Sequence, residues 1–231
     1  MNIGKSESIS TISEKLANQV VSKKRVADHG EVYTNPREVN AMLDLVKSET
    51  QRIDSRFLEP ACGTGNFLVE ILSRKLEVVY QKYSSNQSDF ERYLILAVSS
   101  IYGIELLQDN VLACRKRLIE LVTSTLQKKF KNKTHQDVFK SVEFILEKNI
   151  IWGDALTLKT VGKDPKPIVF SEWSLVHEGM IKRRDFAFDA LLNHAQMREL
   201  PLFSDLGDEV FIPSPVKDYP LVSYLQVYGA S

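Results

Sequence analysis

Residues 56–68, RFLEPACGTGNFL, constrain the fold of this 231-residue chain more than any other stretch. A short apolar run ends in an acid at Glu59, and a turn containing Gly63 and Gly65 then leads into a helical pattern that begins near Asn66. A strand, a glycine turn and a helix in this order predict a nucleotide-type binding corner, because the N–H groups of the turn face the carboxyl end of the strand. The two glycines let a ligand approach the backbone closely. Glu59 would repel a pyrophosphate but suits a ligand that carries an ammonium or sulfonium group. Many glycine turns only close a strand–helix connection, so the turn alone does not establish a site.

The amino-acid composition limits the cellular compartment and the binding partners that we expect for this chain. Thirty basic and thirty acidic residues cancel, so no global cationic field holds a nucleic acid, and any DNA contact must come from a local patch or a partner. Cys62 and Cys114 provide no disulfide framework and indicate a reducing cytoplasm. No apolar run approaches the ~20 residues of a transmembrane helix, and the N-terminus lacks the apolar stretch of a signal peptide. We therefore expect a cytoplasmic protein with one sizeable core, no membrane partner and no metal site.

One further strand is predicted to end in an acid, and another is predicted to end in a turn at Gly153, with an acid just past it. Residues 101–106 form a buried apolar run that ends near Glu105, and residues 149–152 form another run before Gly153 and Asp154. Helical periodicity predicts helices after the glycine turn, at 89–99 and at 108–130. An acid at the tip of the second strand accepts hydrogen bonds from ribose hydroxyls; the alternative is that Glu105 caps the next helix. For Asp154 the alternative is an ordinary loop residue. The pattern predicts an α/β fold with a doubly wound, mainly parallel sheet and helices on both faces.

Taken together, four segments resemble motifs of S-adenosylmethionine (SAM)-dependent methyltransferases, in the form seen in DNA adenine-N6 methyltransferases of restriction–modification systems. EPACGTGNFL is similar to the family's first motif, IYGIEL to its second and GDAL at 153–156 to its third, while GEVYTNP at 30–36 is similar to a segment upstream of the first. The resemblance covers residues 30–174 and implies a class I, Rossmann-like methyltransferase fold with SAM as cofactor.

The resemblance also implies roles for individual residues. Tyr33 would contact the cofactor, Thr34 its methionine end, Glu105 its ribose, and Asp154 would accept a hydrogen bond from its adenine amino group. The positions that match the family's cofactor-binding motifs are Tyr33, Thr34, Glu59, Pro60, Ala61, Gly63, Gly65, Asn66, Phe67, Glu105, Leu106, Asp154, Ala155 and Leu156.

The chain departs from the family at the catalytic motif. Adenine-N6 methyltransferases carry Asp/Asn/Ser-Pro-Pro-aromatic after one more strand, and no such tetrapeptide occurs in this sequence. At the expected place, a strand is predicted at 168–170, followed by Ser171, Glu172, Trp173 and Ser174 at its carboxyl end. In that position Ser171 or Glu172 would accept a hydrogen bond from the target amino group, and Trp173 would stack on the flipped base. The alternative is a degenerate site in which Trp173 is a packing residue.

Basic clusters are the candidate DNA contacts. A helix is predicted over 180–198, and Lys182, Arg183 and Arg184 at its start oppose the helix dipole, which suggests a phosphate partner. A second cluster at 22–25 follows a predicted helix at 11–21 and is more typical of a solvated helix end than of a phosphate contact.

The chain divides into a polar N-terminal extension (1–29), a methyltransferase domain (30–200) and an irregular C-terminal arm (201–231). Proline, aspartate and glycine punctuate the arm, which predicts one or two short strands. Its apolar end, at 224–228, either packs back on the domain or docks on a partner.

The leading functional hypothesis is methyl transfer from SAM to adenine N6 in DNA. The chain would act as a modification enzyme, or as a subunit that needs another protein to read sequence, because no separate target-recognition domain is evident. One alternative keeps the transfer but changes the acceptor to RNA, protein or a small molecule. Another is a catalytically silent methyltransferase fold that serves as a binding or regulatory subunit.

Overall fold

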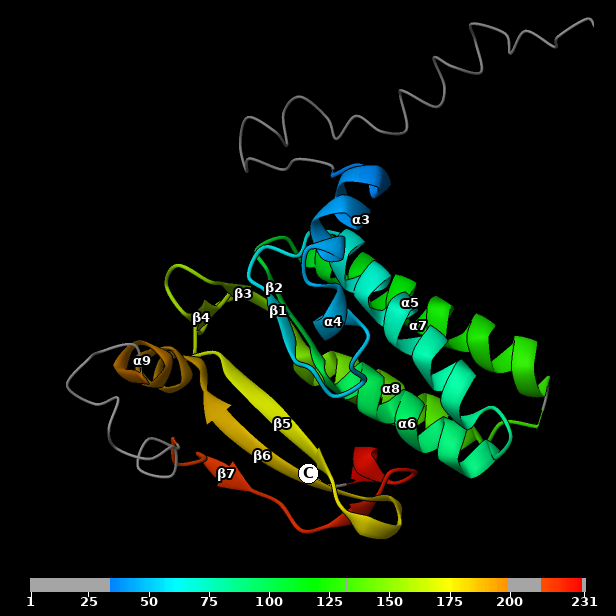
Figure 1. The fold of residues 1–231 in the computed structure, drawn as a ribbon. Coiled ribbons are helices and arrows are strands. Elements are labelled where there is room, and N and C mark those ends of the chain that lie inside the picture. Colours follow the sequence, from blue (N-terminus) through cyan, green and yellow to red (C-terminus); the bar gives the residue numbers. More distant parts are fainter. Residues whose placement is uncertain (1–33, 132, 199–212, 230–231) are drawn as a thin grey trace, which may run out of the picture.

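The computed structural model describes residues 34–131, 133–198 and 213–229, which form two β-sheets and a group of helices (Figure 1). The predicted helix at 11–21, the basic cluster at 22–25 and Tyr33 lie outside the described residues. The first sheet contains the parallel strands β1 (Phe57–Glu59), β2 (Ile101–Glu105) and β3 (Ile150–Asp154) and the short antiparallel strand β4 (Lys159–Thr160). The predicted α/β class and mainly parallel sheet are confirmed.

Three of the helices of this part begin at a capping asparagine or at a glycine. The helices are α3 (Pro36–Asp44), α4 (Lys47–Thr50), α5 (Asn66–Tyr83), α6 (Gln87–Ser99), α7 (Gln108–Phe130) and α8 (Gln136–Asn149). The Asn35 side chain accepts a hydrogen bond from the Arg37 N–H at the start of α3, and Asn86 caps α6 in the same way. Gly65 stands at the N-cap of α5 in a left-handed conformation.

The strand order does not show the reversal that defines a doubly wound sheet. In the described residues the order is β1-β2-β3-β4, with β1 at one edge. Helices α5 and α6 connect β1 to β2, and α7 and α8 connect β2 to β3; right-handed crossovers in one direction put such helices on one face. Figure 1 shows α5–α8 gathered on one side of the strands. The doubly wound prediction is therefore corrected, because after β3 the chain turns back into β4 instead of adding another crossover unit.

A second, antiparallel sheet covers the other face of the parallel strands. It contains β5 (Val169–Leu175), β6 (Met180–Ala187), β7 (Lys217–Asp218) and β8 (Val222–Ser223), and α9 (Phe188–Arg198) follows β6. Tyr102 and Ile104 of β2 pack against Phe170 and Phe188 in a compact apolar cluster. The Tyr102 hydroxyl also donates to the Ser171 carbonyl at 3.0 Å. The antiparallel sheet also touches the helices, because Trp173 of β5 packs edge-on against Phe144 of α8 and lies in the main core.

The prediction of a helix over 180–198 is wrong for the first half of that range. Residues 180–187 are strand β6, in which Ile181, Arg183 and Asp185 are buried at alternate positions. Two of these three buried residues are charged, and each neutralises the other through an ion pair of 2.8 Å. The alternation of a strand is therefore hidden in the sequence, because its inward positions do not look apolar.

The described end of the chain packs against the helices. Tyr224 and Val227 are buried in the main core, and the Tyr228 hydroxyl donates to Asp137 of α8 at 2.9 Å. Of the two alternatives for residues 224–228, packing back on the domain is confirmed, and β7 and β8 are the short strands expected there. Within the described ranges, no helix is long and apolar enough to span a bilayer, and no group of three potential metal ligands occurs.

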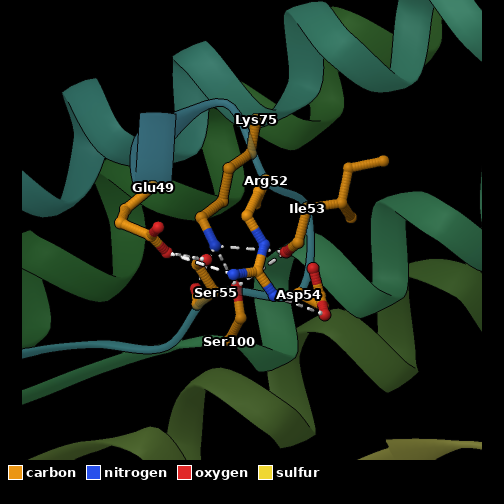
Figure 2. A network of polar contacts seen from close by, with 7 residues as sticks. All are labelled: Glu49, Arg52, Ile53, Asp54, Ser55, Lys75 and Ser100. Carbon is orange, nitrogen blue, oxygen red and sulfur yellow. Dashed lines mark hydrogen bonds and ion pairs between the residues drawn. The ribbon is translucent and has the colours of Figure 1, made fainter. Parts of the chain in front are cut away.

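A fully buried lysine holds together the amino end of the parallel sheet. Lys75 of α5 has no exposed surface, and its ammonium donates to the carbonyls of Ile53 and Ser55 and to the Ser100 hydroxyl (Figure 2). An ammonium has three N–H donors, so the three acceptors satisfy it. The loop before β1, the start of β2 and α5 are thereby linked. Burial lowers the pKa of Lys75 to about 7.

Replacing Lys75 with Met is expected to destabilise the chain by about 2 kcal/mol at neutral pH, because three buried acceptors lose their donor while the cost of burying a charge disappears. The pKa of Lys75 is depressed by folding from 10.5 to about 7, so the unfolded chain binds this proton more tightly between those values. The stability contribution of Lys75 therefore rises with pH across that window and is lowest below pH 7. Urea unfolding at pH 7 and pH 9.5 measures this.

The matched control is Lys82→Met, at an exposed lysine of the same helix, which is expected to change stability by less than about 0.5 kcal/mol. The cost of Lys75→Met should be larger at pH 9.5 than at pH 7. An equal cost at both pH values would show that Lys75 does not titrate in this range.

Candidate functional site

The carboxyl ends of the three parallel strands bring three acids to one edge of the sheet. Glu59, Glu105 and Asp154 are the last residues of β1, β2 and β3. The strand register places Glu59 opposite Gly103 and Glu105 opposite Trp152. The prediction that Glu59 and Glu105 end strands is confirmed, whereas Asp154, expected past a turn at Gly153, belongs to β3 itself. Ligands of open α/β sheets bind at this edge, outside the carboxyl ends of the strands.

The turn after β1 needs glycine at two positions for different reasons. Gly65 has φ 84°, and a Cβ atom there would lie 2.5 Å from the sulfur of Cys114, so packing excludes any side chain. Gly63 has φ 51°, but a Cβ atom there would meet no atom of the described residues within 4 Å. The space over Gly63 is therefore open, as a close ligand approach requires.

Cys62 and Cys114 are both buried free thiols. The pKa of Cys62 is raised by its hydrogen bond with Cys114 and by burial.

Glu105 shapes this turn from the neighbouring strand. Its side chain is nearly buried, and its Oε2 atom accepts a hydrogen bond from the Gly63 N–H at 2.8 Å. Its Oε1 atom accepts from the Leu107 N–H at 2.9 Å, at the start of α7. The alternative role, an acid that caps the next helix, is thus realised in the same residue. A carboxylate has about four lone-pair sites, so acceptor capacity remains for ligand hydroxyls.

Glu59 carries a buried oxygen without a partner. Its Oε2 atom is inaccessible to solvent and has no hydrogen-bond donor among the described residues. Burial, with a smaller contribution from the negative charge of Glu105, raises the pKa of Glu59 to about 8. An unpaired buried carboxylate is costly unless a cation reaches it. The corner is therefore electrostatically suited to a ligand that brings a positive charge.

A contact from α7 that sequence reasoning missed fixes the turn in place. Arg117 donates through Nη1 to the Thr64 carbonyl at 2.7 Å and to Asn66 Oδ1 at 2.8 Å. Asn66 in turn donates through Nδ2 to the Thr34 carbonyl at 3.2 Å, so Thr34 does lie beside the turn. More than fifty positions separate Arg117 from the turn, and no local pattern in the sequence identifies it.

Asp154 organises the loop after β3. Its two oxygens accept from the Leu156 N–H at 2.8 Å and the Thr157 hydroxyl at 3.0 Å, and these bonds lower its pKa. Across the same edge, the Trp152 indole N–H donates to the Leu106 carbonyl at 2.9 Å and joins β3 to the loop after β2. Trp152 was not among the predicted site residues.

The other predicted cofactor residues differ in exposure. Pro60 and Ala61 are exposed on the turn, Leu106 is half exposed, and Leu156 is almost fully exposed. Phe67 packs against the main core and Ala155 against the cluster beneath the antiparallel sheet, so both are held by packing.

The predicted catalytic quartet does not join this edge. Ser171, Glu172, Trp173 and Ser174 lie inside β5, not at the carboxyl end of a parallel strand, which corrects the predicted position. Ser171 is buried and donates to Asp185 Oδ1 at 2.7 Å. Trp173 is 4% exposed and donates from its indole nitrogen to Asn149 Oδ1 at 2.9 Å. The alternative reading of Trp173 as a packing residue is the one that this geometry supports.

The predicted DNA-contact cluster is paired within the chain. Lys182 forms an ion pair with Asp218, and Arg184 forms one with Glu172 at 2.6 Å. Arg183 is 5% exposed and is held by Asp185 between aromatic rings, with its guanidinium 4.0 Å from the Tyr219 ring centroid. A buried, paired guanidinium does not reach a phosphate, so the prediction for Arg183 is corrected. The helix dipole argument also fails here, because these residues lie on a strand.

The fold and the site define an α/β protein with an acidic ligand corner at the carboxyl edge of three parallel strands. Comparison of the chain with protein-family models, with curated proteins and with solved structures yields no match.

Proposed function

We propose that this chain binds SAM at the carboxyl edge of β1, β2 and β3 and forms the cofactor-binding part of a methyltransferase that modifies adenine N6 in DNA. The observation that carries the proposal is the buried Oε2 atom of Glu59, which has no partner among the described residues, together with the space over Gly63 that no described residue fills. SAM carries a sulfonium and an ammonium group, and either cation would satisfy this carboxylate. The motif resemblance of residues 59–68, 101–106 and 153–156 supports the same ligand.

Three groups of the chain would hold SAM. Glu59 would face its positive charge, Glu105 would accept hydrogen bonds from the ribose hydroxyls, and the open space over Gly63 would admit its methionine part. When bound, SAM supplies an electrophilic methyl group on the sulfonium sulfur. The chain's own contribution is to position this group, because Arg117 and Glu105 fix the turn before any ligand arrives.

The acceptor side of the reaction requires a further contribution. Ser171 and Trp173 are buried in the antiparallel sheet, and Glu172 is held by Arg56 at 2.5 Å and by Arg184. These residues are therefore engaged in the fold and not free to receive a base. This observation favours the form of the hypothesis in which the chain is a subunit, and a partner supplies the groups that bind the target adenine and read the sequence.

The first test is calorimetric titration of the purified chain with SAM. The wild-type chain is expected to bind, and Glu105→Ala is expected to weaken binding at least about tenfold, because hydrogen bonds to a charged group are lost and the turn loses its anchor. Glu120→Ala, at an exposed position of α7, is the matched control and should bind like the wild type. A folded wild-type chain that does not bind SAM would contradict the proposal.

The same burial of Ser171 and Trp173 favours one second candidate, a SAM-binding regulatory subunit that performs no transfer. Labelled-methyl transfer to mixed-sequence DNA separates the two. If the chain, alone or with its partner, transfers the label to adenine in DNA, the result supports the methyltransferase. SAM binding without transfer to DNA, RNA or protein supports the regulatory subunit.

A further inference from the structure

A cavity lies at the opposite end of the parallel sheet from the acidic corner. It has a volume of about 560 Å³, and its walls include Ile53, just before β1, and Ser100, just before β2. Both residues mark the amino ends of the strands, whereas the acidic corner is at the carboxyl ends. The volume is in the range of small-molecule sites. The cavity is thus separate from the proposed SAM site.

Three cationic side chains line the cavity, and two of them, Arg52 and Arg56, also form ion pairs with acids. Arg52, Arg56 and Lys82 line it, and Asp54 is the acidic residue among the lining side chains. Beneath it lies the Lys75 network, because Ile53 and Ser100 accept hydrogen bonds from the Lys75 ammonium (Figure 2). The cationic side chains that line the cavity therefore favour an anion as ligand.

The cations of the cavity are only weakly engaged or can exchange partners. Arg52 has exposed ion pairs of 3.5 Å with Glu49 and 3.4 Å with Asp54, and pairs of this kind contribute little. Arg56 pairs with Glu172 at the rim and remains half exposed. Lys82 forms no ion pair with any residue that the structure describes. A phosphate could therefore replace or share these contacts at small cost.

An aromatic surface adjoins the cations. Tyr83 and Tyr93 both line the cavity, and their rings are stacked with centroids 3.8 Å apart and an interplanar angle of 10°. Aromatic side chains of this kind stack on nucleobases, with about 1 to 3 kcal/mol per base. Trp173 and Ser174 also line the cavity. The Arg92 guanidinium lies 5.1 Å from the Tyr93 ring centroid, so the outer face of Tyr83 is the aromatic face left for a base beside the cations.

We propose that this cavity binds a nucleotide unit, with its phosphate held by Arg52 and Lys82 and its base against the tyrosine pair. The unit belongs either to a free mononucleotide or to a single strand of nucleic acid. The proposal goes beyond SAM binding and does not depend on it, because none of the cavity's residues belongs to the acidic corner.

Titration with three probes tests the proposal: inorganic phosphate, thymidine 5′-monophosphate and a short oligothymidylate. Thymine probes avoid any adenine subsite at the acidic corner. We expect the nucleotide or the oligonucleotide to bind more tightly than phosphate, and Arg52→Glu and Lys82→Glu each to weaken binding about tenfold. Tyr83→Leu should weaken nucleotide binding and leave phosphate binding unchanged.

The matched control is Lys116→Glu, the same charge change at an exposed site on α7, which should leave binding unchanged. Tighter binding of the oligonucleotide, with a salt dependence that Lys82→Glu reduces, would identify a strand as the ligand; tighter binding of the monophosphate would identify a free nucleotide. The proposal is overturned if the folded chain binds neither thymine probe, if phosphate binds as tightly as the nucleotide, or if Lys116→Glu has the same effect as Lys82→Glu. SAM titration of the same samples reports on the acidic corner independently.

Discussion

Gly65→Ala is expected to lower the free energy of unfolding by about 3 to 5 kcal/mol, through two additive causes. The first is backbone strain, because residue 65 has φ 84°, where a non-glycine residue costs about 1 to 3 kcal/mol. The second is a clash, because the new methyl group would lie 2.5 Å from the sulfur of Cys114. Cys114 is fully buried and cannot move aside without disturbing the core. Urea unfolding followed by circular dichroism measures the loss.

Gly63→Ala is the matched control for this prediction. Residue 63 also has positive φ, but its new methyl group meets no atom of the described part of the chain within 4 Å, so only the strain of about 1 kcal/mol remains. The variant should therefore fold, and it should bind SAM more weakly because the methyl group occupies the ligand's space. Cys114→Ala in the Gly65→Ala background should recover part of the lost stability. Strictly additive effects of these two substitutions would show that the clash is not the cause.

The parts of the fold that sequence predicts are those with local signals. The helices at 66–83, 87–99 and 108–130 follow from helical periodicity, and the strand–turn–helix at 57–66 follows from its acid and its glycines. Helix α8 was not predicted, although its buried Val138, Val142 and Ile145 recur at helical spacing.

Other parts depend on contacts that no local pattern encodes. Strand β6 has charged residues at its buried positions. It forms as a strand because it pairs with the neighbouring strands β5 and β7. The alternation of strands and helices predicts a doubly wound sheet, but it does not specify which strand, if any, pairs on the other edge of β1. At the candidate site, the three acids were predictable because each ends a strand. Arg117 and Cys114 were not, since the fold alone brings α7 to the turn.

SAM binding is expected to weaken steeply as the pH falls below 8, because the cation needs the ionised form of Glu59. Burial and the nearby charge of Glu105 raise the pKa of Glu59 from 4.5 to about 8 in the free chain. Protonation of Glu59 thus reduces the binding-competent fraction by about tenfold for each pH unit below that value, and the apparent affinity falls in proportion. Between pH 7.5 and pH 6, where the amino group of the ligand stays largely charged, we expect a loss of about twentyfold.

The titration of Glu59 also determines how the stability of the free chain changes with pH and whether SAM binding releases a proton. Because the folded pKa of Glu59 is raised, its contribution to the stability of the free chain is present below pH 4.5 and is lost as the pH rises through 8. SAM reverses this trend, since it favours the ionised carboxylate and releases about one proton per molecule bound near pH 6.5. Calorimetry in two buffers of different ionisation enthalpy counts that proton. Glu59→Gln should bind weakly at every pH and release no proton, whereas Glu77→Gln, on the exposed face of α5, should behave like the wild type. A wild-type affinity that does not change between pH 6 and pH 7.5 would show that SAM does not engage Glu59.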